Sequence, residues 1–202
     1  MPKVKICGIT HSTEIAIMNE LRPDYIGFVF VSQSRRFIAP EHAARLRSVL
    51  NPAIKAVGVF RNAPPKTAAL AAETAGLSMI QLHGDETGEY IAQLREYTKC
   101  GIIQAFKIST TLDIERASNS PADYVLLDGS ANAGRKFDWS MIPGSLRRNY
   151  FLAGGITPAN VTLAAAVNPK PYALDISTGA EAGRLKDYRK TMQLIQGARG
   201  KC

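Results

Sequence analysis

Reactive side chains stand at the ends of several short apolar runs in this chain. Cys7 ends one run near the N-terminus, Asp128 directly follows another, and Asp175 stands near the end of a third. A thiolate can act as a general base, and a carboxyl group in partly desolvated surroundings can hold its proton and act as a general acid. These residue types indicate acid–base chemistry if the fold brings them together.

Each of these residues also has a structural interpretation. Cysteine is often a small buried apolar residue, so Cys7 is either packed in the interior or a general base. Asp128 is either a general acid or a residue that caps the following loop. For Asp175, the position favours capping, or orienting a neighbouring side chain, over direct proton transfer.

Two glycine-containing segments near the C-terminus could bind an anion. Gly154-Gly155 and Ser177-Thr178-Gly179 each follow an apolar run and precede a predicted helical segment. Glycine lets the backbone approach a ligand closely, and the amides at a helix N-terminus donate to an anion. The glycines could merely permit tight turns, but the pairing of the two segments favours a phosphate site.

Other side chains that follow apolar runs could contact a substrate. Arg36 could hold a carboxylate through two hydrogen bonds. Arg35 beside it is expected to be solvated, because neighbouring residues of an extended loop point apart. His83 is either a ligand contact or a hydrogen-bonded loop histidine. Arg36 and His83 are therefore candidate substrate residues.

Eight short apolar runs divide the chain into regular units. The runs are nearly continuous rather than alternating, which is typical of parallel strands buried on both faces. The predicted strands cover 4–7, 25–30, 54–60, 79–82, 102–108, 124–127, 150–153 and 172–176. The predicted helices cover 10–22, 40–50, 64–75, 87–97, 158–167 and 187–198, and segment 110–121 is expected to hold only a turn or two of helix.

The alternation of strands and helices predicts the fold class α/β, with parallel strands wound in one direction. Eight such units close into a (β/α)8 barrel (TIM barrel), whereas a doubly wound open sheet usually stops at five or six strands. The 202 residues leave about 25 per unit, near the minimum for this fold. We expect a single barrel domain over residues 1–202. Catalytic residues of such barrels lie at the carboxyl ends of the strands, so the candidate residues should meet at one mouth.

Composition and charge restrict the class of partner. The chain is 46% hydrophobic and carries a net charge of +8. It has no apolar run near the ~18 residues of a membrane span, so we expect a cytoplasmic protein with no membrane partner. A positive charge suits anionic ligands, but nucleic-acid binding usually shows basic residues concentrated in one run. We therefore expect a small phosphorylated substrate and no nucleic acid.

The basic residues near the C-terminus are spaced like the solvated face of a last helix. They are Arg184, Lys186, Arg189, Lys190, Arg199 and Lys201. The three cysteines are odd in number and lack metal-ligand spacing, so no disulfide framework or metal site is expected. Cys100 and Cys202 lie away from the predicted mouth, and structural roles are expected for both. The sequence does not separate a monomer from a homodimer.

Six motifs, taken in order, resemble those of the phosphoribosylanthranilate isomerases of tryptophan biosynthesis. They span nearly the entire chain, and the first and the last are the most specific. The motifs are Lys5-Ile6-Cys7-Gly8-Ile9-Thr10, Gln81-Leu82-His83-Gly84-Asp85, Leu126-Leu127-Asp128, Phe137-Asp138-Trp139, Leu152-Ala153-Gly154-Gly155-Ile156 and Asp175-Ile176-Ser177-Thr178-Gly179-Ala180-Glu181.

The resemblance implies an isomerase that performs an Amadori rearrangement with no metal and no organic cofactor. Its substrate would be N-(5-phosphoribosyl)anthranilate and its product 1-(2-carboxyphenylamino)-1-deoxyribulose 5-phosphate. By match to the family, Cys7 would be the general base at sugar C2 and Asp128 the general acid at the ring oxygen. Arg36 would lie near the anthranilate carboxylate, and Gly154-Gly155 and Ser177-Thr178 would hold the phosphate.

The chain departs from the family pattern in one segment. Where relatives usually carry a Gly-Gly-Thr-Gly-like stretch, this chain has the shorter and more basic segment 129–136, which puts loop closure and substrate affinity in question.

Two alternative functions stay open. A histidine-pathway-type isomerase runs the same rearrangement on a substrate with two phosphates, but normally has an aspartate in place of Cys7. A barrel that binds phosphorylated ligands without catalysis is the second.

Overall fold

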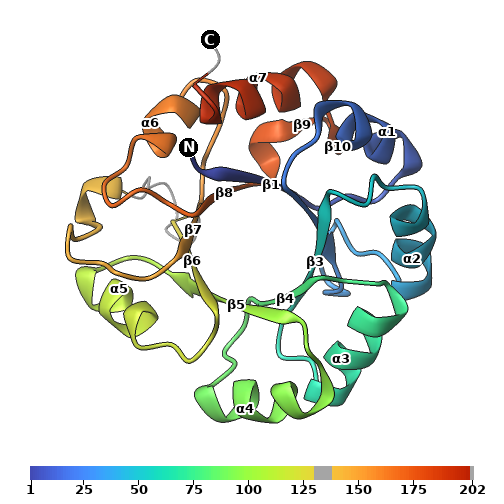
Figure 1. Cartoon of the computed structure of the whole chain (residues 1–202), viewed down its shortest axis with the longest axis horizontal. Helices are drawn as coiled ribbons and strands as arrows, with labels where there is room; N and C mark the ends of the chain where they lie inside the picture. The colour runs from blue at the N-terminus through green and yellow to red at the C-terminus, as the bar shows by residue number, and fades with distance from the viewer. Residues whose placement is uncertain (130–137, 201–202) are drawn as a thin grey trace.

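Eight parallel strands close into a barrel in which each strand pairs with the next and β8 pairs with β1 (Figure 1). This computed structural model describes residues 1–129 and 138–200. The strands are β1 (Lys3–Cys7), β2 (Tyr25–Val29), β3 (Lys55–Phe60), β4 (Met79–Leu82), β5 (Gly101–Lys107), β6 (Tyr124–Asp128), β7 (Tyr150–Ala153) and β8 (Ala173–Ile176). The predicted (β/α)8 class is confirmed, and each predicted strand forms at its expected place.

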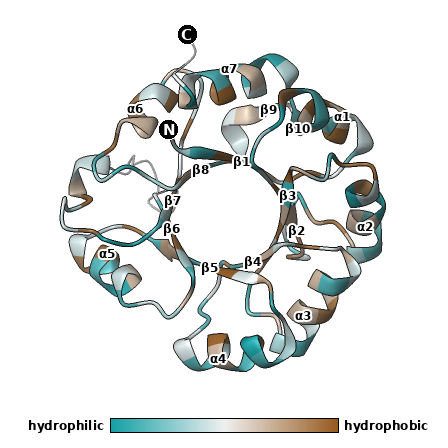
Figure 2. Ribbon diagram, in the orientation of Figure 1, coloured by the Kyte–Doolittle hydropathy of each residue, from teal (hydrophilic) through white to brown (hydrophobic). Residues whose placement is uncertain are grey.

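The helices form a ring around the barrel (Figure 1). They are α1 (Ser12–Leu21), α2 (Pro40–Ser48), α3 (Pro65–Thr74), α4 (Gly88–Tyr97), α5 (Thr111–Ser118), α6 (Val161–Ala165) and α7 (Tyr188–Ala198). Their starts follow local chemistry: proline opens α2 and α3, and the side chains of Thr87 and Asp187 accept backbone N–H groups at the starts of α4 and α7. Hydrophilic and hydrophobic stretches alternate along these helices (Figure 2), so one side of each can pack on the barrel.

Helix α5 forms two turns over eight residues, as expected for segment 110–121. Two other elements differ from the sequence prediction. Helix α6 has five residues, fewer than predicted for 158–167, because the backbone of Asn160 is not helical (φ −127°, ψ 0°) and residues before Val161 form a turn instead. A two-stranded hairpin of β9 (Glu181–Ala182) and β10 (Leu185–Lys186) after β8 was not predicted.

Among the described residues between β6 and β7, the helical element is η1 (Trp139–Met141), a 3-10 helix, and η2 (Thr178–Ala180) is a second such turn after β8. Most of the shortened basic segment 129–136 falls on residues 130–137, which lie outside the described residues, as does Cys202. No helix in the described part of the chain is long and apolar enough to cross a membrane.

Side chains alternate between the barrel interior and the helical layer. On β1 this alternation places Lys5 and Cys7 on the same side of the strand, and the register sets Lys5 beside Asp175 of β8. An interior apolar cluster contains Tyr25, Val57, Met79, Ile103, Leu126, Phe151, Ala153 and Ala173. Strands and helices together enclose the larger core. The interior is thus apolar in one layer and polar in the layer that leads to the carboxyl ends of the strands.

A group of tyrosines surrounds Lys3 at the start of β1. The Tyr172 hydroxyl accepts a hydrogen bond from Lys3 Nζ at 2.8 Å and lies 2.9 Å from the Tyr25 hydroxyl, and the Tyr124 hydroxyl donates to it at 3.5 Å. Burial alone would raise the pKa of Tyr172, but these hydrogen bonds outweigh it and lower the pKa to about 8.

Candidate active site

One cavity of about 650 Å³ opens at the carboxyl ends of the strands. Every site residue predicted from the sequence lines it: Cys7, Arg36, His83, Asp128, Gly154, Gly155, Asp175, Ser177 and Thr178. The expectation that these residues meet at one mouth is therefore met in the structure.

Cys7 lies at the end of β1 and is 8% exposed. Gly27 on the neighbouring strand makes room for it, since a Cβ at that position would lie 2.6 Å from Cys7 Sγ. Burial raises the pKa of the Cys7 thiol, while the positive charges of Lys5 and Lys186 work in the opposite direction. A thiolate formed here is a stronger base than an ordinary cysteine thiolate.

Lys5 is fully buried beneath Cys7 and is paired with Asp175. Its Nζ donates to both Asp175 carboxylate oxygens at 2.9 Å and to Gln81 Oε1 at 2.8 Å. Burial alone would lower the pKa of Lys5, but Asp175 and Cys7 outweigh it and raise the pKa. Asp175 thus holds a neighbouring side chain in place.

Asp128 lies at the end of β6 and is 8% exposed. Its Oδ2 is 3.3 Å from His83 Nε2, and His83 Nδ1 is 2.9 Å from Gln81 Nε2. His83 is therefore hydrogen-bonded within the protein, as one sequence interpretation expected, and it also lines the cavity. Its contact with a ligand stays a prediction.

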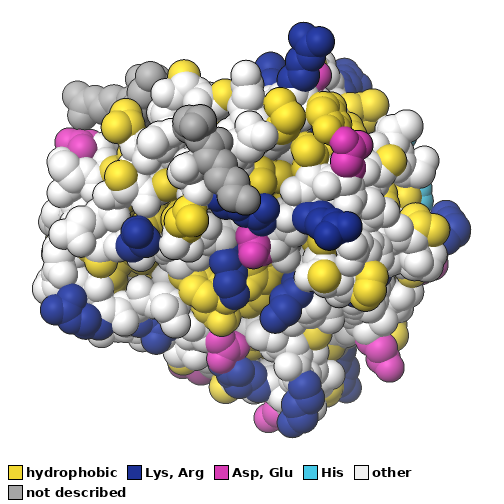
Figure 3. Space-filling model, turned by 45° about the horizontal axis from the view of Figure 1, so that its top comes forward, with side chains coloured by type: hydrophobic (Ala, Val, Ile, Leu, Met, Phe, Trp, Pro, Cys, Tyr) yellow, Lys and Arg dark blue, Asp and Glu magenta, His cyan; other side chains and the backbone are white. Residues whose placement is uncertain are grey.

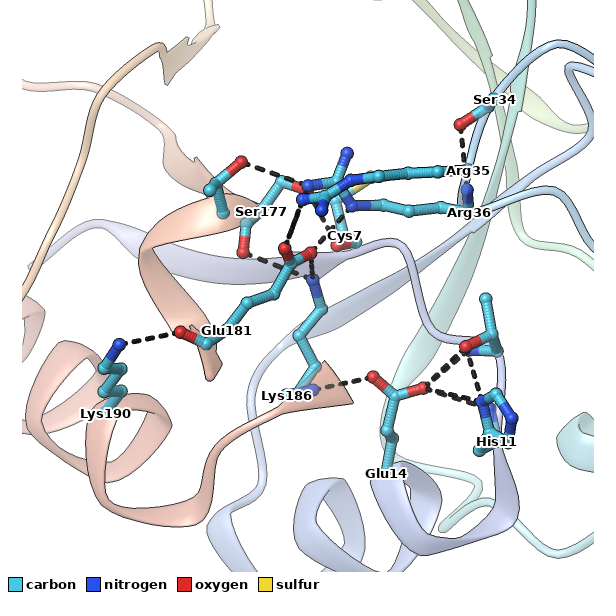
Figure 4. Close-up of polar contacts among 12 residues, drawn as sticks. Cys7, His11, Glu14, Ser34, Arg35, Arg36, Ser177, Glu181, Lys186 and Lys190 are labelled. Carbon is cyan, nitrogen blue, oxygen red and sulfur yellow. Dashed lines mark hydrogen bonds and ion pairs between the residues drawn. The ribbon is translucent and has the colours of Figure 1, made fainter. Parts of the chain in front are cut away.

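The Glu181 carboxylate binds three positively charged side chains at the mouth of the barrel (Figure 4). Its carboxylate accepts from Arg36 Nε at 2.7 Å, from Arg35 Nη2 at 2.6 Å and from Lys186 Nζ at 2.8 Å. These contacts and the charge of Lys186 lower the pKa of Glu181, although its burial acts in the opposite direction. Thr178 Oγ1 accepts a further bond from Arg36 Nη2 at 3.0 Å.

Two sequence expectations about basic residues were wrong. Arg35 is half-exposed but does not point away from Arg36, because both guanidinium groups converge on Glu181. Lys186 is not on a solvated helix face: it lies on β10 with a fully buried side chain. Lys190, at the start of α7, lines the cavity and donates to the Glu181 backbone carbonyl at 2.7 Å. Glu181 therefore binds Arg35 and Lys186 through its carboxylate and Lys190 through its backbone carbonyl.

Glu14 ties the first loop to the C-terminal hairpin. One of its oxygens accepts the backbone N–H groups of Thr10 and His11, and the other accepts that of Lys186 at 2.9 Å (Figure 4). Glu14 is 1% exposed. This buried carboxylate fixes the position of β10 relative to the loop that follows Cys7.

The two glycine-containing loops form one side of the cavity. Gly154 and Gly155 have φ of 97° and 67°, a left-handed backbone that other residues rarely adopt. Gly179 lies so close to the Ile156 carbonyl that an added Cβ would overlap it. The Ser177 hydroxyl donates to the Cys7 carbonyl at 3.2 Å. The loops after β7 and β8 are therefore held against each other, as a shared anion site requires.

Several residues that build the site were not identified as candidates from the sequence. Gln81 and Glu181 stand inside the motifs used for the family resemblance, so the signal was present but no role followed from it. Glu14 and Lys186 gave no signal, because their importance comes from contacts with residues distant in the chain.

Arg36 and Lys190 contribute positive charge to the wall of the cavity. Several Lys and Arg side chains lie close together near the middle of the face shown in Figure 3, with acidic side chains beside them. Such a field favours the approach of a ligand that carries negative charge. In residues 1–129 and 138–200, no group of three or more His, Cys, Asp or Glu side chains is arranged to hold a metal ion.

Comparison with known proteins places the chain among named enzymes. A family model described as N-(5'-phosphoribosyl)anthranilate (PRA) isomerase matches residues 4–197. The N-(5'-phosphoribosyl)anthranilate isomerase of Thermotoga maritima is 38% identical, over 99% of this chain and 100% of that protein. The enzyme of the same name from Thermoanaerobacter sp. (strain X514) is 37% identical, over 99% of both chains.

Solved structures agree with these sequence matches. A phosphoribosyl anthranilate isomerase in complex with reduced 1-(o-carboxyphenylamino)-1-deoxyribulose 5-phosphate superposes with a TM-score of 0.89. It is 37% identical, and the match covers 99% of this chain and 100% of that one. The enzyme from Thermus thermophilus gives a TM-score of 0.86 at 33% identity, over 98% of both chains.

Proposed function

The chain belongs to the N-(5'-phosphoribosyl)anthranilate isomerase family, and from this premise we propose that Cys7 is its general base and Asp128 its general acid. It is an isomerase of tryptophan biosynthesis. The observation that carries the proposal is that Cys7 and Asp128 line one cavity from two strands that are not neighbours. A bound sugar can therefore meet the two groups at different atoms.

The reaction needs one proton given to the ring oxygen and one taken from C2, followed by transfer of a proton to C1 and loss of the C2 hydroxyl proton. Asp128 gives its proton to the ring oxygen of the phosphoribosyl group, the bond from C1 to that oxygen breaks, and the anthranilate nitrogen supplies the electrons for a C1–nitrogen double bond. The Cys7 thiolate then takes the proton from C2, and the electrons of that C–H bond form an enolamine. Transfer of a proton to C1 and loss of the C2 hydroxyl proton give the ketose, so the atoms balance without an added reagent.

The remaining site residues would bind the two anionic ends of the substrate. The phosphate would sit against the backbone amides of the loops that contain Gly154-Gly155 and Ser177-Thr178, as is common in barrels of this class. Glu181 and Thr178 hold the Nε and Nη2 edge of Arg36, so we expect the anthranilate carboxylate at Nη1. The named relative solved with a reduced product analogue supports a phosphorylated small molecule as the ligand class.

Two substitutions test the assignment. Cys7→Ala and Asp128→Asn should each lower kcat by at least ~100-fold, the usual contribution of a general acid or base. Cys100→Ala is the matched control, because Cys100 lies before β5 and bonds the Leu77 carbonyl, away from the cavity. Near-normal kcat in either site variant would reject its role. Complementation of a tryptophan auxotroph that lacks this isomerase tests the activity in cells.

Three further points stay proposals. One-domain organisation over residues 1–202 predicts a single resistant fragment in limited proteolysis. A cytoplasmic location is tested by cell fractionation. The oligomeric state is open: one relative is described as a dimeric enzyme from which monomers were generated, and sedimentation of this protein would decide between the two states.

A further inference from the structure

A chain of hydrogen bonds crosses the barrel interior from Lys5 to Asp128. Lys5 Nζ contacts Gln81 Oε1 at 2.8 Å, Gln81 Nε2 contacts His83 Nδ1 at 2.9 Å, and His83 Nε2 contacts Asp128 Oδ2 at 3.3 Å. Lys5 is fully buried and Gln81 is 1% exposed. Lys5 lies on β1, Gln81 on β4 and Asp128 on β6, and His83 directly follows β4, so the chain links the region beneath Cys7 to the proposed general acid.

The chemistry of its two ends gives this chain a direction. A lysine ammonium has only N–H groups to donate, so the Gln81 amide must turn its oxygen toward Lys5 and its NH2 toward His83. His83 Nδ1 then has to accept a hydrogen bond and cannot carry a proton. The neutral ring is therefore protonated at Nε2, and this N–H donates to Asp128 Oδ2.

We propose that Gln81 and His83 are positioning residues that determine which oxygen of Asp128 carries the catalytic proton. The inference rests on the proposed role of Asp128 as general acid. Because Oδ2 accepts from His83 Nε2, the carboxyl proton is placed on Oδ1. After Asp128 has given this proton to the substrate, the same N–H bond stabilises the carboxylate that is left.

Lys5 and Asp175 lie at the end of this chain of hydrogen bonds that is farther from Asp128, and we call the whole chain, from Asp175 to Asp128, the relay. The Asp175 carboxylate holds the Lys5 ammonium through two contacts of 2.9 Å, and the ammonium fixes the Gln81 amide. The ion pair thereby sets the tautomer of a histidine with which it has no direct bond. If Gln81 had only a structural role, it would pack in the interior without selecting a tautomer of His83. The positioning role and the structural role of Gln81 therefore predict different tautomers after substitution, and the tautomer can be measured.

The tautomer can be measured directly by nitrogen NMR on the whole protein labelled with ¹⁵N-histidine. The chain has three histidines, and comparison with His83→Gln and His42→Gln assigns the His83 ring. We expect Nε2 protonated and Nδ1 unprotonated in the unmodified protein. A His83 ring protonated at Nδ1, or at both nitrogens, would overturn the proposal.

Gln81→Glu is the decisive variant. A carboxylate at this position accepts from both Lys5 and the ring, so the His83 proton should move to Nδ1 and leave Nε2 without a proton to donate. We expect this switch in the NMR spectrum together with a loss of at least ~10-fold in kcat and a change in KM below ~3-fold, as for an interaction made mainly in the transition state. An unchanged tautomer, or a change confined to KM, contradicts the relay.

Further variants control for misfolding and for failure of the proposed function itself. Gln81→Met removes both hydrogen bonds at similar size, and His83→Gln keeps a side-chain N–H that His83→Phe lacks, so His83→Gln should retain more kcat than His83→Phe. His42→Gln, exposed on α2, should leave kcat unchanged. If Asp128→Asn keeps full kcat while the His83 tautomer is as expected, the proposed acid is wrong. If Asp128→Asn is inactive and the tautomer differs, the relay alone is wrong.

Discussion

Glu181→Gln should destabilise the protein and weaken substrate binding together. Glu181 has a side chain that is 3% exposed, and it accepts hydrogen bonds from Arg35, Arg36 and Lys186. Glutamine keeps one oxygen acceptor but loses the charge, so the Lys186 ammonium, which is fully buried, stays in the interior without its carboxylate. Arg36 also loses the group that holds it over the cavity.

The contacts set the size of the effect. Removing one partner of a buried ion pair costs about 3–5 kcal/mol, because the remaining charge is left without compensation. The pair with Arg35 adds only about 0–1 kcal/mol, since that guanidinium is half-exposed. For a chain of this length, 1 kcal/mol lowers Tm by roughly 2–4 °C. The expected decrease in Tm is therefore roughly 6–24 °C, and the retained amide oxygen favours the lower part of that range.

Thermal unfolding of a double-mutant cycle checks the cause. Lys186→Met removes the stranded ammonium, so Glu181→Gln with Lys186→Met should regain at least ~2 kcal/mol over the sum of the single effects. Glu41→Gln, a substitution of an exposed glutamate on α2, should change stability by less than about 0.5 kcal/mol. Additive single effects would show that Lys186 does not depend on Glu181 and would refute the reasoning.

The pH dependence of Tm is an independent test of the role of the Glu181 carboxylate. The pKa of Glu181 in the folded protein lies below its ordinary value of 4.5, so its ionised form contributes stability above pH 4.5 that is lost as the pH falls through the lower, folded value. The difference in Tm between the unmodified protein and Glu181→Gln should therefore be largest near neutral pH and shrink in strong acid. A difference that grows on acidification would contradict the assigned cation partners.

Three other predictions follow from single contacts. Arg36→Ala should raise KM by ~10–100-fold with a smaller effect on kcat, since one charged hydrogen bond contributes about 1.5–3 kcal/mol; an unchanged KM in steady-state assays would remove its carboxylate role. Tyr172, whose pKa of about 8 lies below the ordinary 10.0, should add stability as the pH rises from 8 to 10. Two pKa units correspond to about 2.7 kcal/mol, which solvent screening reduces to about 1 kcal/mol, and urea unfolding should show no such rise in Tyr172→Phe. Gly179→Ala places a Cβ against the Ile156 carbonyl, so the loop must shift at a cost of about 1–3 kcal/mol, and KM should rise while inorganic phosphate inhibits less strongly.

The barrel could be predicted from the sequence because its strands are buried on both faces. That burial leaves short, nearly continuous apolar runs, and eight of them at regular intervals admit few topologies. The starts of the helices could also be predicted from the sequence, because proline and side-chain caps act within three or four residues of the helix that they begin. The exception is α6, where the backbone of Asn160 is not helical and the helix begins only at Val161, a departure that apolar spacing does not show.

The site could be predicted only as a list of side chains at strand ends. The rules for a barrel place Cys7 and Asp128 at the same mouth, and the structure brings both to one cavity. Their partners come from far along the chain: Lys5 pairs with Asp175 at a separation of 170 residues, and Arg36 with Glu181 at 145. No local pattern encodes such pairs. Lys186 was placed on the surface by its spacing, but its ammonium pairs with Glu181 five residues away and its backbone N–H donates to Glu14 at a separation of 172 residues.

The ion pairs of Lys5 with Asp175 and of Lys186 with Glu181 affect the pKa of the proposed base. The ammonium groups of Lys5 and Lys186 both lower the pKa of Cys7, but Asp175 and Glu181 are paired with them. The positive charge near the thiol is therefore largely balanced, and burial becomes the dominant influence, which is why the pKa of Cys7 is raised. A higher pKa makes the thiolate a stronger base but lowers the fraction of Cys7 that is ionised at neutral pH. The two carboxylates thus do more than hold their lysines: by offsetting positive charge that would otherwise favour the thiolate, they help set the balance between basicity and ionised fraction at the proposed base.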